Sequence, residues 1–252
     1  MSLLLRQGLL AFATMITLIG FSSAAYADSF HVSGATYDAT ATVTQVGNQL
    51  TVVLTNNFAN QGDVSSSISG FKFTIVGFGG SALTVLSQTG RAVQFSGTND
   101  VFNDIGGTSA ADTLGWAITG SAGTFTLNAL GVTGPNGTNP PDETIAGVPS
   151  SQTASTVTYT GANASMEGDS HNPIVAHTAT YVFTVTGLTG TAQFSNASFF
   201  LGTGPTEVTC TDCCADCTPG MTGSPTPEPA SMLLLGTGLI GLAGAARRRF
   251  RK

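Results

Sequence analysis

The stretch TATVTQVGNQLTVVLTN, residues 40–56, consists of two runs rich in Thr and Val that are joined by Gly47-Asn48. Thr and Val favour strands because their branched side chains pack well on a pleated, half-buried surface. A Gly-Asn pair between two such runs is typical of a two-residue hairpin turn. The stretch therefore predicts two antiparallel strands that are connected by a tight turn.

The same chemistry recurs along the chain, where further runs of β-branched and aromatic residues are separated by Gly, Asn, Pro and Asp. These runs are residues 71–78, 82–88, 91–97, 114–120, 124–130, 155–161, 178–187 and 191–202. Large apolar residues alternate along two of them, at Phe71, Phe73 and Ile75 and at Tyr181, Phe183 and Val185. Alternation places each set on one side of a strand. Many short strands with no helical period predict an all-β fold, an antiparallel β-sandwich of jelly-roll-like type, over residues 28–205.

Two other segments are predicted to be connectors. Residues 131–152, GVTGPNGTNPPDETIAGVPSSQ, are rich in turn-forming residues and predict a long loop. Residues 206–226 are rich in Pro, Gly and Thr and predict a linker.

The N-terminus has the features of a signal peptide. Arg6 precedes an apolar stretch at residues 9–21, which is followed by small residues and by Ala25-Tyr26-Ala27. A basic residue, a short apolar helix and an A-x-A site are what a signal peptidase requires. We expect residues 1–27 to be a signal helix that is removed after Ala27, so that the protein is exported.

The C-terminus combines an apolar segment with a basic tail. Residues 230–246 are apolar or small apart from Ser231 and Thr237, and this length is the low end of what crosses a hydrocarbon core of about 30 Å. Five of the chain's eight basic residues follow, Arg247, Arg248, Arg249, Arg251 and Lys252. Basic clusters next to a span stay on the cytoplasmic side. The sequence predicts one transmembrane helix at 230–246 and a cytoplasmic tail at 247–252.

The charge between these ends is strongly acidic. Residues 28–229 contain two basic residues, Lys72 and Arg91, and all 14 acidic residues, which gives a formal charge of −12. Such a body repels nucleic acid and anionic lipid, so neither is an expected partner. Membrane contact is expected only through the C-terminal helix before processing.

All four cysteines lie in the linker as C-x-x-C-C-x-x-C, at Cys210, Cys213, Cys214 and Cys217. Export favours disulfides, whose connectivity the spacing leaves open. A zinc or iron–sulfur site and free or intermolecular thiols are the alternatives. The cluster is expected to touch neither the β-core nor the C-terminal segment.

Catalytic and metal-binding motifs are weak. A Ser-His-Asp arrangement could form from His171 and Asp169 with Ser165 or Ser170, but no nucleophile elbow is present. His171 and His177 could bind a metal together with Asp169. A turn or surface role is the competing interpretation. Asp100 and Asp104 are the calcium candidates, with a turn role as the alternative, because Ca²⁺ takes several oxygen ligands.

Residues 227–252 have a second, more specific pattern. Pro227-Glu228-Pro229, the apolar segment and Arg247, Arg248 and Arg249, in this order at the end of the chain, resemble the PEP-CTERM sorting signal of exported bacterial proteins. Residues 90–98 and 112–120 are also similar to exosortase-dependent surface proteins.

The resemblance implies an exosortase substrate. An exosortase is a membrane-embedded cysteine transpeptidase, and it is expected to cut near the triplet, discard the helix and pass the body to the cell surface or to an extracellular matrix of exopolysaccharide. The expected partners are therefore the exosortase, the secretion machinery and exopolysaccharide.

The sequence thus predicts a protein that is anchored in the inner membrane as a precursor and then reaches the envelope, the outer surface or the exterior. We expect a structural or adhesive role, no cofactor and no enzymatic activity of its own. A carbohydrate- or calcium-binding module, a plain membrane-anchored periplasmic domain and a hydrolase whose site only folding assembles are the alternatives.

Overall fold

The computed structural model describes residues 26–59, 61–80, 83–105, 111–130, 143–188, 190–204 and 206–210. Within these ranges the chain is mostly β, which confirms the all-β prediction. The predicted signal helix up to Ala25, the predicted span and the basic tail lie outside the described residues. None of the helices in the described ranges is long and apolar enough to cross a membrane.

The strands follow one another with few helical turns between them. They are β1 Tyr26–Ser33, β2 Asp38–Val46, β3 Gln49–Asn56, β4 Ile68–Ile75, β5 Leu83–Thr98, β6 Val101–Asp104, β7 Asp112–Thr113, β8 Ala117–Ser121, β9 Thr124–Asn128, β10 Ile145–Ala146, β11 Ser151–Gln152, β12 Thr156–Thr158, β13 Ile174–Val185, β14 Phe194–Leu201 and β15 Thr206–Thr209. The helical turns are η1 Val64–Ser66, α2 Ala164–Glu167 and η2 Asp169–His171.

Strands β2 and β3 form the hairpin that the opening stretch predicts. Val46 pairs with Gln49 across the turn, and Gly47 adopts a left-handed φ of 60° that its missing Cβ makes easy. Every second residue of both strands is buried, so the Thr side chains of β2 face outward. The alternation in the sequence therefore sets the register of the sheet.

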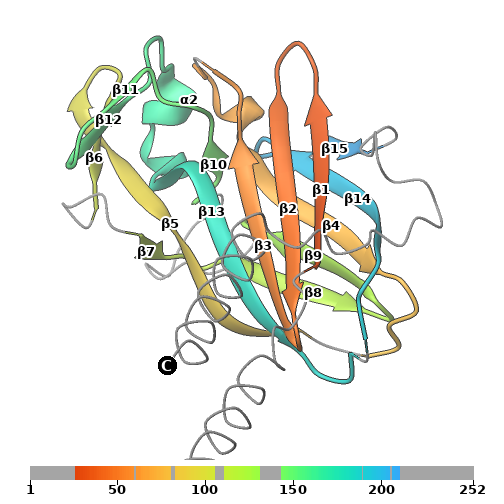
Figure 1. The fold of residues 1–252 in the computed structure, drawn as a ribbon. Helices are drawn as coiled ribbons and strands as arrows, with labels where there is room; N and C mark the ends of the chain where they lie inside the picture. The colour runs from red at the N-terminus through yellow and green to blue at the C-terminus, as the bar shows by residue number, and fades with distance from the viewer. Residues whose placement is uncertain are drawn as a thin grey trace, which may run out of the picture. The chain divides into compact units, whose positions relative to one another are not determined.

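Hydrogen bonds join all the strands of the described part into one branched sheet. This sheet folds into two layers. One layer has the order β1-β2-β3-β13-β5, and the other has the order β15-β14-β4-β9-β8. Short β10 links them, because it pairs in parallel with β13 and antiparallel with β4. Figure 1 shows β1, β2 and β3 in front of β4, β9 and β8. The layers resemble those of the predicted sandwich, but β10 makes their hydrogen bonding continuous.

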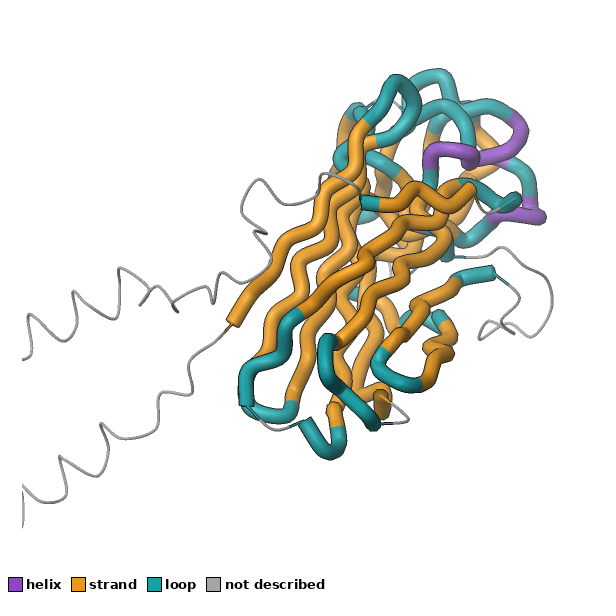
Figure 2. The backbone as a smooth tube through the Cα atoms, turned by 90° about the vertical axis from the view of Figure 1, so that its right-hand side faces the viewer, coloured by secondary structure: helices purple, strands orange, loops and turns teal. Residues whose placement is uncertain are grey.

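The two layers enclose a main core, and Figure 2 shows the strands from the side. Its aromatic members are Phe30, Phe71, Phe73, Phe78, Trp116, Phe125, Tyr181, Phe183, Phe194 and Phe199, and Leu50 and Leu54 pack with them. Phe71 of β4 is fully buried, and its ring centroid lies 5.0 Å from that of Phe199 and 6.1 Å from that of Phe30. Since β1 and β4 belong to different layers, these rings fasten one layer to the other.

A smaller second core lies beside the first. It consists of Val64, Val93, Phe102, Ala146, Val157, Tyr159, Met166, Ile174 and Ala176. The Phe102 and Tyr159 rings meet edge to face with centroids 5.5 Å apart. Strand β5 reaches both cores, because its first half pairs with β13 and its second half pairs mainly with β6.

The structure differs from the predicted element boundaries in three places. Residues 82–88 and 91–97, expected as separate strands, form the single strand β5, in which Gly90 leaves room for the Val175 side chain. Strands β10 and β11 lie within the segment predicted as a loop. Strand β15 begins inside the segment assigned to the linker and pairs with β14.

Candidate functional site

The C-terminal end of the described chain is fixed to the sheet. The backbone N–H of Cys210 donates to the carbonyl oxygen of Ala197 at 3.0 Å, and the Cys210 side chain packs against the main core. Cys210 is disulfide-bonded. The expectation that the cysteine cluster touches no core is therefore wrong for Cys210, because β15 brings this residue back onto the domain. Cys213, Cys214 and Cys217 lie outside the described residues.

A charged pair holds β15 across β14. Lys72 of β4 donates to Glu207 of β15, and the Lys72 Nζ also lies 5.7 Å from the centroid of the Phe200 ring. The hydrogen bond from Lys72 is the main cause that lowers the pKa of Glu207. Both side chains are partly exposed, so the pair orients β15 more than it stabilises the fold.

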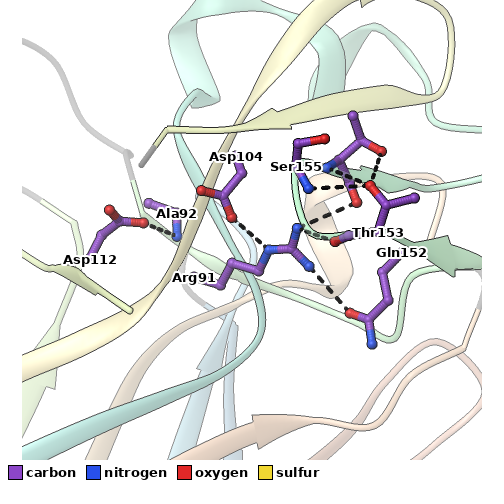
Figure 3. A network of polar contacts seen from close by, with 8 residues as sticks. Arg91, Ala92, Asp104, Asp112, Gln152, Thr153 and Ser155 are labelled. Carbon is purple, nitrogen blue, oxygen red and sulfur yellow. Dashed lines mark hydrogen bonds and ion pairs between the residues drawn. The ribbon is translucent and has the colours of Figure 1, made fainter. Parts of the chain in front are cut away.

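Asp104, one of the two calcium candidates, forms an ion pair with Arg91. Its buried Oδ2 accepts a hydrogen bond from Arg91 Nε at 2.8 Å, as Figure 3 shows. The same guanidinium donates to the Thr153 carbonyl oxygen at 2.8 Å and to the Thr156 carbonyl oxygen at 3.4 Å. Because a guanidinium already neutralises this carboxylate, Asp104 is poorly placed to ligate a cation.

Asp100, the other calcium candidate, lies at the opposite end of β6, in the turn that follows β5. It has a left-handed φ of 66°, and its Oδ1 accepts hydrogen bonds from the backbone N–H groups of Gly161 and Ala162, each at 2.9 Å. This is the alternative turn role. The described residues contain no group of three His, Cys, Asp or Glu side chains that could hold a metal ion.

Glu143, the first described residue of the predicted loop, is buried and hydrogen-bonded to the β7–β8 connection. Its Oε2 accepts from the backbone N–H of Gly115 at 2.6 Å, and its carbonyl oxygen accepts from Trp116 Nε1 at 2.9 Å. The Trp116 ring lies 5.1 Å from that of Tyr181, centroid to centroid. Trp116 is thus a core residue.

The two histidines lie on different elements. Ser165 belongs to α2, and Ser170 is the neighbour of His171 in η2. His171 lies in η2, whereas His177 lies at a bulge of β13 with a left-handed φ of 66°, and burial lowers its pKa. The Ser165 hydroxyl donates to Asn163 Oδ1 at 2.6 Å and accepts from the Val64 N–H at 3.1 Å. Its two contacts therefore join the α2 turn to η1, which is a structural role.

Sequence reasoning missed the polar bonds that surround the second core. Asn163 Nδ2 donates to Asp63 Oδ2 at 2.7 Å, and Asn172 Nδ2 donates to the Met166 carbonyl oxygen at 2.8 Å. The partners in these contacts belong to loops without a periodic pattern, and Asp63 and Asn163 are 100 residues apart. The only available signal was that Asn and Asp often cap helical turns.

The sorting residues predicted at Pro227, Glu228, Pro229, Arg247, Arg248 and Arg249 lie outside the described residues, as does Ala25. Ala27, the last residue before the predicted signal-peptide cut, is described. It lies in β1 opposite Thr44, where its side chain is exposed.

Comparison with known proteins gives one specific match and one distant one. No curated protein matches the chain. A solved structure, the KRT10-binding region domain of the pneumococcal serine-rich repeat protein PsrP, is 15% identical, with 75% of this chain and 86% of that chain covered, at a TM-score of 0.22. That score is too low to support any inference.

The specific match concerns the end of the sequence. Residues 225–249 match the PEP-CTERM protein-sorting motif, which confirms the resemblance of the triplet, the apolar segment and the arginines. This motif implies an exported protein that is anchored in the envelope as a precursor and sorted by an exosortase. The chain therefore carries a C-terminal PEP-CTERM protein-sorting motif.

Proposed function

We propose that this chain is a structural or adhesive protein of the bacterial surface or extracellular matrix, which an exosortase cuts near Pro227-Glu228-Pro229. The sorting motif at residues 225–249 is the observation that carries the proposal. In this proposal the signal peptide directs export, the apolar segment anchors the precursor, and the β domain is the part that remains. The chain is then the substrate of an enzyme and not an enzyme itself.

The junction between the domain and the sorting motif supports this order of events. Cys210 packs against the main core, so the β domain extends to residue 210, and the sorting motif begins 15 residues later, at residue 225. Pro227 and Pro229 restrict the backbone on both sides of Glu228 and disfavour helix there. An extended segment can enter the active-site cleft of a membrane-embedded transpeptidase.

The outer face of the β2-β3-β13 layer supports a role in surface contact. Its cross-strand rows are Thr40–Thr55–Thr178, Thr42–Val53–Thr180 and Thr44–Thr51–Val182. These half-buried side chains present hydroxyls and methyls without charge. Such a face can contact a neutral polymer without desolvating ions, and exopolysaccharide is the polymer that we propose.

Intact mass and cell fractionation of the protein from its native host test the processing step. We expect the wild-type mature chain to lack residues 1–27 and the apolar segment 230–246, and to leave the inner membrane. Glu228→Ala should keep both the mass of that segment and the inner-membrane location. Glu207→Ala, which changes a glutamate of the domain, is the matched control and should be processed normally.

A different result would favour the plain anchor. If the wild-type mature chain keeps residues 230–252 and stays in the inner membrane, exosortase processing is wrong and the body is a periplasm-facing domain. If Glu207→Ala blocks processing as strongly as Glu228→Ala, the effect belongs to folding and not to the triplet.

A further inference from the structure

The bond at which the signal peptide is expected to be removed lies inside a strand. Strand β1 begins at Tyr26, so it contains both Ala27 and Asp28, the residues on either side of the predicted cut. Ala27 pairs with Thr44 of β2. Asp28 pairs with Val43, no register shift lies between the two pairs, and Figure 1 shows β1 beside β2. The bond between Ala27 and Asp28 is therefore part of the sheet.

The pairing engages the peptide group of this bond. In an antiparallel pair, one of every two successive residues exchanges both its backbone N–H and its C=O with the residue opposite. If that residue is Ala27, its carbonyl oxygen accepts from the N–H of Thr44. If it is Asp28, its N–H donates to the carbonyl oxygen of Val43. In either case one half of the peptide group to be cut is hydrogen-bonded to β2.

Strand β2 is firmly held at the end where this pairing occurs. Gln45 pairs with Tyr26 and is buried. The Gln45 Nε2 donates to the carbonyl oxygens of Gly47 at 2.8 Å and of Gly190 at 2.9 Å. The Gln45 Oε1 accepts from the backbone N–H of Ala192 at 2.6 Å. These bonds fix the part of β2 against which the residues before the cut are paired.

The part of β1 after the cut has anchors of its own. Phe30 and Val32 are buried in the main core, and the Phe30 ring centroid lies 6.1 Å from that of Phe71 in the other layer. Of the eight residues of β1 that pair with β2, two precede the predicted cut and six follow it. The mature chain therefore keeps most of β1, and the sheet does not depend on the residues that are removed.

We propose, on the basis of the signal peptide in the proposed function, that signal peptidase cuts this chain before β1 docks on β2. The cut consumes one water: its oxygen joins the Ala27 carbonyl carbon, the bond to the Asp28 nitrogen breaks, and the products end in a carboxylate and begin with an ammonium. The attack makes the carbonyl carbon tetrahedral, so the peptide group has to leave the flat ladder of the sheet. Cleavage and docking of β1 thus compete for the same bond, and once β1 has docked, cleavage waits until it leaves the sheet.

Cleavage of the folded full-length chain by purified bacterial signal peptidase, in a mild detergent, tests this order. A peptide of residues 1–35, which carries the whole signal but too little chain to form the sheet, is the reference. We expect the folded wild type to be cut at least about tenfold more slowly than the peptide, because only molecules whose β1 is undocked can be cut. Phe30→Ser removes the ring that anchors β1 and should raise the rate toward that of the peptide. The same substitution in the peptide should leave its rate unchanged.

Phe194→Ser is the matched control, because it removes another buried phenylalanine ring of the main core, on β14 instead of β1. Circular dichroism checks that both variants are folded. Phe194→Ser should raise the cleavage rate much less than Phe30→Ser does. An equal increase would overturn the proposal, because unfolding of the whole domain and not release of β1 would then expose the bond.

The comparison of wild type and peptide decides the question even where a variant does not fold. A folded wild type that is cut as fast as the peptide overturns the proposal, because the peptidase would then cleave the docked strand, and the signal peptide itself would stand. A peptide that is not cut after Ala27 overturns the signal peptide of the proposed function, and this order of events with it. Neither result bears on exosortase processing.

Discussion

The main core lies between two layers of strands and is held mostly by aromatic and aliphatic side chains, whereas the second core is surrounded by an ion pair and capped turns. In the main core the contacts repeat along each strand, so losing one ring weakens the joint between whole layers. In the second core each polar bond fixes one loop. The main core is therefore stabilised mostly by the burial of apolar side chains, and the loops around the second core are held by individual hydrogen bonds.

The largest effect is expected in the main core. Phe71→Ala removes a fully buried ring that packs against Phe73 and Phe199. We expect a loss of about 3–5 kcal/mol in the free energy of unfolding, the usual cost of a large cavity. Urea denaturation, followed by the fluorescence of Trp116, measures it. Val53→Ala, on the half-buried outer face of β3, is the control and should cost far less.

A smaller and more local effect is expected in the second core. Asp104→Ala leaves the Arg91 guanidinium, whose side chain is 13% exposed, without its carboxylate partner. Breaking such a pair costs about 3 kcal/mol or more, and we expect β6 and β12 to lose hydrogen-exchange protection while β2 and β3 keep theirs. Protection lost equally in all four strands would show that the two cores unfold as one unit.

The double variant Arg91→Met/Asp104→Leu sharpens this test. Replacing both charges with apolar groups of similar size removes the desolvation cost together with the attraction, so much of the lost stability should return. Only part of the lost stability should return, because Arg91 also donates hydrogen bonds to the carbonyl oxygens of Thr153 and Thr156, and Met cannot replace them. A double variant with a lower free energy of unfolding than Asp104→Ala would mean that those hydrogen bonds contribute more to stability than the ion pair does.

These two regions also show what the sequence could predict. The strands of the main core repeat large residues at every second position, as at Phe71, Phe73 and Ile75, and this period predicted their buried faces correctly. The Gly47-Asn48 turn was likewise visible, because its chemistry is local. The predicted sorting residues belong to a local motif at the end of the chain, and the comparison found this motif at residues 225–249.

The second core was not predictable in the same way. Arg91 and Asp104 are close in sequence, but their bonds to Thr153 and Thr156 depend on where distant segments meet. Asp100 looked like a calcium ligand because Asp serves both metal sites and turns, and only the three-dimensional partners separate the two. Strand β15 lies in a segment whose content of Pro, Gly and Thr predicts a linker, and its four residues are too few to show an alternating pattern against that composition.

A moderate effect that depends on pH is expected at Asp63. Hydrogen bonds from the Ser65 backbone N–H and from Asn163 stabilise its charged form and lower its pKa below the ordinary value of 3.8. A lowered pKa adds stability that is fully present above 3.8 and is lost as the pH falls through the folded value. Asp63→Asn keeps an oxygen that can cap η1 and removes only the charge, so it should cost about 0.5 kcal/mol near neutral pH and progressively less below pH 3.8. Denaturation curves at several pH values check this, and a cost that stays constant into acid would show that the charge is irrelevant.

The smallest effect is expected at the charged pair that holds β15. Glu207→Gln removes the ionic part of its contact with Lys72, but both side chains are partly exposed to water. Exposed pairs contribute about 0–1 kcal/mol, so the free energy of unfolding should hardly change. Hydrogen exchange at β15 is the sharper measurement, because this edge strand pairs with β14 alone in the described chain. If protection falls in β15 alone, the pair orients the segment that leads from the domain to the sorting motif. If protection in β4 falls as well, the pair belongs to the main core, and the contrast between the two regions is weaker than their contacts indicate.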